Sequence, residues 1–195
     1  MRYQGTRTSK THMVVQRRRW GIPSATEGAQ LLEFALAMPL LVVLLVGISD
    51  FATAYNLKQK LTNAAREGAR IAAIQSRADL TRANPSSVQA VRNAVAAYLA
   101  NAGVTRCSIN TTATAAGNFT WTYSSSGAGC TASPILTIER NFPVTVNGTT
   151  TLSTRVTLNY PFNWLFSRVI GLLVPSASFP GATWMSTRAI MENLT

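Results

Sequence analysis

The sequence predicts an α+β protein: a long amino-terminal helix, half of it able to cross a membrane, that leads into a small head with an antiparallel sheet. Three observations predict this. Residues 34–48 read FALAMPLLVVLLVGI, with no charged or strongly polar side chain. Apolar residues then recur at intervals of three to four, as in a helix. From residue 105 onward, Thr, Val, Ile and aromatic residues alternate in short runs between turn residues, which is typical of strands.

Composition narrows the class of protein. The chain has 195 residues, 47% of them apolar, which is enough for a core. Only 13% are charged, about half the usual share for a soluble domain, which indicates a membrane or assembly protein. With one histidine and two cysteines, a histidine or zinc metal site is not expected. The acids are scattered, and neither a phosphate loop nor a catalytic triad is found. We therefore expect no enzyme, cofactor or metal.

The basic excess is concentrated at the amino terminus. Residues 1–28 hold six Lys and Arg against one acid, a balance of +5, and the whole chain carries +11. Such a tail can bind phosphates of nucleic acid. It stands directly before an apolar segment of about twenty residues, however, which as a helix spans about 30 Å, the thickness of a bilayer core. Basic residues in this place hold the amino end in the cytoplasm, so we predict a lipid bilayer as partner and no nucleic acid.

Three interpretations fit a basic stretch followed by an apolar one. The first is a secretory signal peptide, with Ala52-Thr53-Ala54 as a cleavage site. The second is a plain transmembrane anchor. The third is a signal cut at the start of the apolar segment, after Gly28, as in prepilins.

Glu33 is the feature of this junction that needs an explanation, because an acid inside a membrane helix costs a few kcal/mol. Either Glu33 stays hydrated, since it lies only about 6 Å beyond Ala29, or it has a partner. Cutting after Gly28 would create a positive amine at Ala29. A carboxylate on a neighbouring helix would neutralise that amine where water is scarce.

The segment from Gly28 to Ala73 resembles the TadE-like proteins, pseudopilins or minor pilins of the tight-adherence (Flp-type) pilus system. The resemblance is carried by a basic leader, a Gly-x-x-x-x-Glu-Phe junction ending in Glu33-Phe34, a Pro-Leu-Leu apolar helix at Pro39, and the segment Asn-Ala-Ala-Arg-Glu-Gly-Ala-Arg from Asn63 to Arg70. It covers about a quarter of the chain.

The resemblance implies a structural role in pilus assembly with a pilin-like head. It implies that a prepilin peptidase cuts between Gly28 and Ala29, and that Glu33 and Phe34 take part in subunit pairing. Its implied partners are other pilins or pseudopilins and pilus-assembly proteins. The implied location is the bacterial inner membrane, single-pass, with the amino terminus cytoplasmic and the head extracytoplasmic. The alternative is a secreted or membrane-anchored binding module unrelated to pili.

The expected organisation has four parts: a basic cytoplasmic leader, 1–28; a transmembrane helix, 29–49; a continuation of that helix, 50–78; and an extracytoplasmic α+β head, 79–195. The continuation carries a stripe of small residues, which lets another element approach closely. The stripe packs either against the protein's own head or against another subunit. Its predicted packing residues are Ala65, Gly68, Ala69 and Ala72.

In the head, Asn84-Pro85 is expected to cap and begin a helix that Gly103 ends. Strands are expected at 105–112, 118–124, 134–147, 150–160 and 182–190, with a turn at 124–129 and a hairpin turn at Asn147-Gly148. The apolar segment 163–174 is expected to be a short helix or loop. We favour core packing for it over a contact with the membrane or a partner.

Cys107 and Cys130 are the only cysteines, and both fall in the part expected outside the cytoplasm, where thiols oxidise. The sequence therefore favours a disulfide between them over two buried free thiols.

Overall fold

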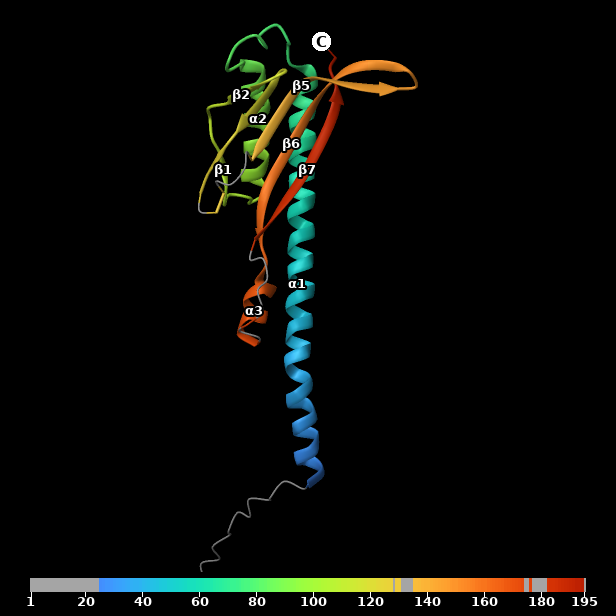
Figure 1. Ribbon diagram of the computed structural model, residues 1–195, viewed down its shortest axis with the longest axis vertical. Coiled ribbons are helices and arrows are strands. Elements are labelled where there is room, and N and C mark those ends of the chain that lie inside the picture. Colours follow the sequence, from blue (N-terminus) through green and yellow to red (C-terminus); the bar gives the residue numbers. More distant parts are fainter. Residues whose placement is uncertain (1–24, 128, 131–134, 174–175, 177–181, 195) are drawn as a thin grey trace, which may run out of the picture. The chain divides into compact units, whose positions relative to one another are not determined.

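The structure, a computed structural model, describes residues 25–127, 129–130, 135–173, 176 and 182–194. Its elements are, in order, α1 (Ala25–Ile74), α2 (Ser86–Asn101), β1 (Ser108–Ile109), β2 (Thr114–Gly117), β3 (Thr120–Tyr123), β4 (Ser125–Ser126), β5 (Leu136–Val146), β6 (Thr149–Asn163), α3 (Leu165–Leu173) and β7 (Ala182–Glu192) (Figure 1). The long apolar helix and the small head with antiparallel sheets are the α+β class that the sequence predicts.

Helix α1 has 50 residues and continues through Pro39. It passes from a first unit, which ends at Leu40, into a second unit, Leu41–Thr195, which contains all the other elements. Most of the predicted leader, residues 1–24, lies outside the described residues.

A five-stranded antiparallel sheet in the order β2-β3-β5-β6-β7 forms the centre of the head. Strands β5 and β6 are joined by the predicted two-residue turn, and Val146 pairs with Thr149. Asn147 and Gly148 have φ angles of 50° and 80°. Positive φ at both central residues is what a tight hairpin turn requires, which is why Asn-Gly predicts it.

The region before β5 differs from the expectation. The strand expected over 105–112 is reduced to the two residues of β1, and β2 lies after that range, where no strand was expected. Part of the expected 124–129 turn is strand β4, which pairs with β1 as a second, two-stranded sheet. Ser108 Oγ lies 2.7 Å from Ser126 Oγ across this pair. These strands have two residues each, so alternation was too short to reveal them.

The core lies between the helices and one face of the large sheet. Along β6, buried side chains alternate with partly exposed polar ones, as expected of a sheet that is covered on one face. The carboxyl-terminal part of α1 and the apolar face of α2 cover it (Figure 1). Where they meet, Gly68 of α1 is close to Val91 and Val95 of α2 and Val156 of β6.

The start of α2 is capped differently from the prediction. Pro85, not Asn84, is the N-cap residue, and it supplies no side-chain hydrogen bond. The Asp79 carboxylate accepts hydrogen bonds instead, from Ser87 N at 2.8 Å, Ser87 Oγ at 2.7 Å and Ser86 Oγ at 3.0 Å. A carboxylate from the preceding loop therefore performs the capping that we expected of the adjacent asparagine.

Candidate membrane and assembly site

The junction residues lie in the first turns of α1. Gly28 is its fourth residue, and nothing lies within 4 Å of the position that a Cβ would take there. Ala29 and Glu33 are both exposed and are four residues apart, so they share one face of the helix. Phe34, next to Glu33, is 60% exposed. The predicted cleavage and pairing residues are therefore all exposed.

The apolar segment that follows is also uncovered. Among the described residues, one helix is long and apolar enough to cross a membrane, and none of its most apolar window is buried. The large apolar side chains that remain exposed here include Leu31, Leu32, Leu36, Leu40, Leu44, Leu45 and Ile48. A contiguous surface of this kind needs lipid or other protein to cover it, which suggests membrane anchoring.

The small-residue stripe has the opposite environment. Ala65, Ala69 and Ala72 have no exposed surface, and Gly68 is buried with them. A Cβ added to Gly68 would lie 2.5 Å from Val95 Cγ2, so only glycine allows α2 to approach this closely. Of the two alternatives left open by the sequence, the structure has the first: these residues pack against the protein's own head.

The end of the apolar segment is marked by a buried acid. Asp50 is 2% exposed, and its Oδ2 accepts a hydrogen bond of 2.6 Å from the backbone N–H of Phe166, in the first turn of α3. One residue on, the Phe51 ring packs edge-on against Trp164, with centroids 5.7 Å apart. The carboxylate accepts a hydrogen bond from the backbone in the first turn of α3, and its negative charge interacts favourably with the positive end of the helix dipole. Asp50 thereby joins α3 to α1.

The other end of α1 is held by a buried arginine. Arg140 of β5 is 1% exposed and donates to Ala72 O, in the last turn of the helix, at 2.5 Å and to Gln75 O, just after its end, at 2.9 Å. Burial lowers the pKa of the Arg140 guanidinium. The negative charge of Asp79 acts against this lowering, and the positive charge of Arg77 adds to it. The charge of Arg140 interacts favourably with the negative end of the helix dipole.

A disulfide joins Cys107 and Cys130, with Cα atoms 5.8 Å apart. It lies at the small sheet of β1 and β4, near the end of β6, where Cys107 N donates a 3.0 Å hydrogen bond to the Tyr160 hydroxyl. The bond fixes a region that has little regular structure of its own.

Two of these residues were missed from the sequence. Asp50 was only one of the scattered acids, and Arg140 was not singled out at all. For Asp50 a signal existed, because it is the first acid after the apolar segment. For Arg140 there was none: what distinguishes it is burial against a helix end that lies 65 residues away in sequence at Gln75.

These features define a protein with one candidate membrane helix and a disulfide-containing head. In a comparison with known families, residues 28–70 match the model described as TadE-like protein. That is the family that the sequence resembles, and it is a structural, non-enzymatic one. It suggests involvement in the tight-adherence pilus system, with membrane and pilin partners. Neither the curated proteins nor the solved structures contain a match.

Proposed function

We propose that this protein is a pseudopilin or minor pilin of a tight-adherence pilus, made as a precursor and cut after Gly28. The supporting observation is the combination at the start of α1. The TadE-like match begins at Gly28, an exposed Glu33 follows five residues later, and an unburied apolar segment comes next. The proposal assigns 1–28 to a cytoplasmic leader, 29–49 to the membrane, 50–78 to the helix continuation and 79–195 to an extracytoplasmic head.

Cleavage by a prepilin peptidase would leave an ammonium group on Ala29 in the membrane edge. A charge left unpaired at low dielectric costs several kcal/mol. Glu33 of a neighbouring subunit would supply the opposite charge, and Phe34 beside it would add apolar contact. The same pairing would bring the exposed apolar faces of two α1 helices together, so that charge neutralisation and helix association favour the same arrangement.

The competing signal-peptide interpretation places the cut after Ala54. Ala54 is 7% exposed and lies in the middle of α1. That cut would also remove Asp50, whose carboxylate binds the first turn of α3. Both observations favour a cut at Gly28 or none.

The intact mass of the membrane-extracted protein tests cleavage. Loss of 28 residues is expected; loss of 54 would indicate a secreted protein, and no loss a plain anchor. Gly28→Leu should leave the precursor uncut, because a bulky side chain prevents close approach of the peptidase to the backbone. Gly47→Leu, on the same helix and also in open space, is the matched control and should be cut normally.

Crosslinking to pilus-system proteins tests pairing. Glu33→Ala and Glu33→Gln should insert and be cut, yet fail to join partners, since both lose the ionised group and the second keeps its size. Glu67→Gln, farther along α1 where Glu67 contacts Arg70, is the control. Normal partner recovery by both Glu33 variants would return Glu33 to a hydrated residue at the membrane interface.

A further inference from the structure

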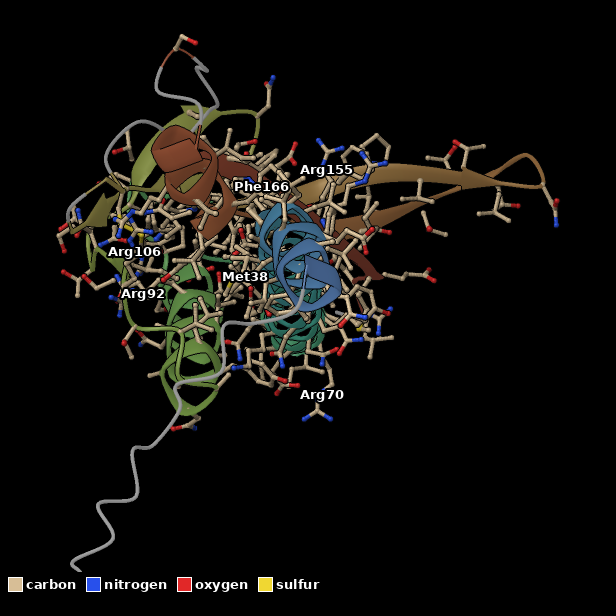
Figure 2. The ribbon with its side chains drawn as sticks, turned by 90° about the horizontal axis from the view of Figure 1, so that it is seen from below. Met38, Arg70, Arg92, Arg106, Arg155 and Phe166 are labelled. Atoms are coloured by element: carbon tan, nitrogen blue, oxygen red, sulfur yellow. A yellow bond between two sulfur atoms is a disulfide. The ribbon has the colours of Figure 1, made fainter. Side chains whose placement is uncertain are left out.

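Helix α3 occupies a defined place beside α1. Its first turn is hydrogen-bonded to Asp50, and Trp164 contacts Phe51. Those two residues of α1 directly follow the apolar segment. Both views place α3 beside α1, and Figure 1 shows it at the end of the sheet opposite the β5–β6 hairpin (Figure 1, Figure 2). A membrane that contains the apolar segment would therefore have its surface at α3.

The core packing that the sequence favoured for 163–174 is wrong for residues 163–171; residue 174 and the side chains of Leu172 and Leu173 lie outside the described part of the chain. No described side chain of α3 is buried, and none belongs to the core cluster. Leu165 is 56% exposed, while Phe166, Val169 and Ile170 are each half-buried. The first turn has no acid, and the one charge on the helix is Arg168. An apolar helix of this kind on a folded head needs a cover.

The surface next to α3 is basic. Arg106 and Arg168 line one cavity of ≈ 550 Å³, together with Trp164, Leu165 and Ser167. Arg106 also lines a neighbouring cavity of ≈ 670 Å³ with Lys60. Among the described residues that line these cavities there is no carboxylate. Within the described part of the chain, no acceptor binds the guanidinium of Arg106 or Arg168.

We propose that α3 is a membrane-surface helix whose apolar side chains enter the bilayer beside α1, while Arg106 and Arg168 bind the headgroup phosphates of anionic phospholipids. Three features on one side of the head match three layers of a membrane surface. The apolar side chains match the acyl region, Trp164 the interface where tryptophan is enriched, and the arginines the phosphate layer. Guanidinium groups bind phosphate oxygens in a bidentate manner.

A nine-residue helix alone would bind a bilayer weakly. Here it is attached to a candidate membrane span through Asp50, so its local concentration at the surface is high. The consequence for the protein is a fixed orientation of the head: α1 alone permits rotation and tilt, and a second contact removes that freedom. The proposal depends on anchoring by α1 and not on cleavage after Gly28 or pairing by Glu33.

The test uses the full, uncut chain in vesicles. Both native cysteines are in the disulfide, so a single new cysteine can carry an environment-sensitive fluorophore. Leu165→Cys places the label on α3. Leu152→Cys, at a residue 44% exposed near the opposite end of β6, is the matched control. In phosphatidylcholine vesicles, quenching by nitroxide on the lipid acyl chains should be severalfold stronger at 165 than at 152.

Equal quenching at the two positions would overturn the membrane docking of α3. A label at 165 that is in water in lipid vesicles, but shielded in native membranes, would overturn it in favour of a protein partner. Neither result would bear on cleavage, which the vesicle experiment does not require.

The second arm tests the phosphate contact in vesicles of equal parts phosphatidylcholine and phosphatidylglycerol. The label at 165 should be quenched more by nitroxide-labelled phosphatidylglycerol than by labelled phosphatidylcholine. Arg106→Gln and Arg168→Gln should each lower this preference, by up to about fivefold. Arg70→Gln, on an exposed residue of α1 away from α3 (Figure 2), should leave it unchanged. An undiminished preference in the double variant would overturn the phosphate contact.

Discussion

Two stretches of the same helix have opposite environments. In the apolar stretch 28–48 of α1 the large side chains are exposed, and Leu36 and Leu40 reach 73% and 72%. In the stretch 54–73 the buried side chains are mostly alanines, and a glycine lies at the tightest contact. The difference teaches that side-chain size, not hydrophobicity alone, separates the exposed stretch from the stretch that packs in the head. Large apolar residues here lack a partner within the described chain, whereas small ones admit α2 and the sheet.

The sharpest test of this comparison exchanges glycine for leucine in each stretch. Gly68→Leu should destabilise the head by about 3 kcal/mol or more, because Val95 is a stiff β-branched residue that cannot move aside easily. Gly47→Leu, where nothing lies within 4 Å, should leave head stability unchanged. Denaturant unfolding in detergent, followed by tryptophan fluorescence, measures both. Similar losses for the two variants would contradict the division of α1.

The next largest effect is expected at the end of the buried stretch. Arg140→Ala should cost about 2–3 kcal/mol of unfolding free energy, because it opens a cavity and removes donors from two helix-terminal carbonyls. Arg66→Ala, on the exposed face of the same helix, is the control and should change stability by less than about 0.5 kcal/mol. If the two variants unfold at the same denaturant concentration, Arg140 is not what holds the end of α1.

A smaller effect is expected where α2, the partner of the small-residue stripe, begins. Asp79→Ala removes the cap and should cost about 1 kcal/mol. Burial raises the pKa of the Asp79 carboxyl, but hydrogen bonds from Ser87 and Ser86 outweigh it and leave that pKa below its usual value. Because the folded pKa is lowered, this stabilisation is complete above the unfolded value of about 3.9 and is lost as the pH falls through the lower folded value. In denaturant unfolding at a series of acidic pH values, the stability difference between the native protein and Asp79→Ala should therefore shrink as the pH falls.

The smallest effect is expected in the middle of the core. The Tyr123 hydroxyl is buried, and no hydrogen-bond partner is found for it within the described residues. Tyr123→Phe should therefore change stability by less than about 0.5 kcal/mol at neutral pH. A loss above 1.5 kcal/mol would mean that the hydroxyl has a partner.

The same residue gives a test at high pH. Burial raises the pKa of Tyr123 to about 12, although the positive charge of Arg92 acts in the opposite direction. Because the folded pKa is raised, the stabilisation linked to the protonated Tyr123 hydroxyl is complete below the unfolded pKa of about 10. It is lost as the pH rises toward 12. Absorbance titration of phenolate should show a step near pH 12, and Tyr123→Phe should abolish that step.

Features that follow from local chemistry were determined by the sequence alone. The apolar segment needs no tertiary contact to be recognised, because its length matches a bilayer. The Asn147-Gly148 turn follows from the backbone preferences of two residues. The Cys107–Cys130 pair follows from there being only two cysteines, and the resemblance to the TadE-like family rests on motifs within residues 28–70.

Only the tertiary structure decided the rest, because each of these features depends on what a distant residue offers. Asp79 rather than Asn84 caps α2 since the loop carries its carboxylate to the helix end. Asp50 is a buried cap because α3, more than a hundred residues later, brings the backbone N–H of Phe166 to its carboxylate. The apolar composition of α3 predicted that it packs in the core. The helix lies outside the core because it follows the end of β6, and that end lies beyond the core (Figure 1). Hydrophobicity specifies that a surface must be covered, whereas the path of the chain determines what is available to cover it.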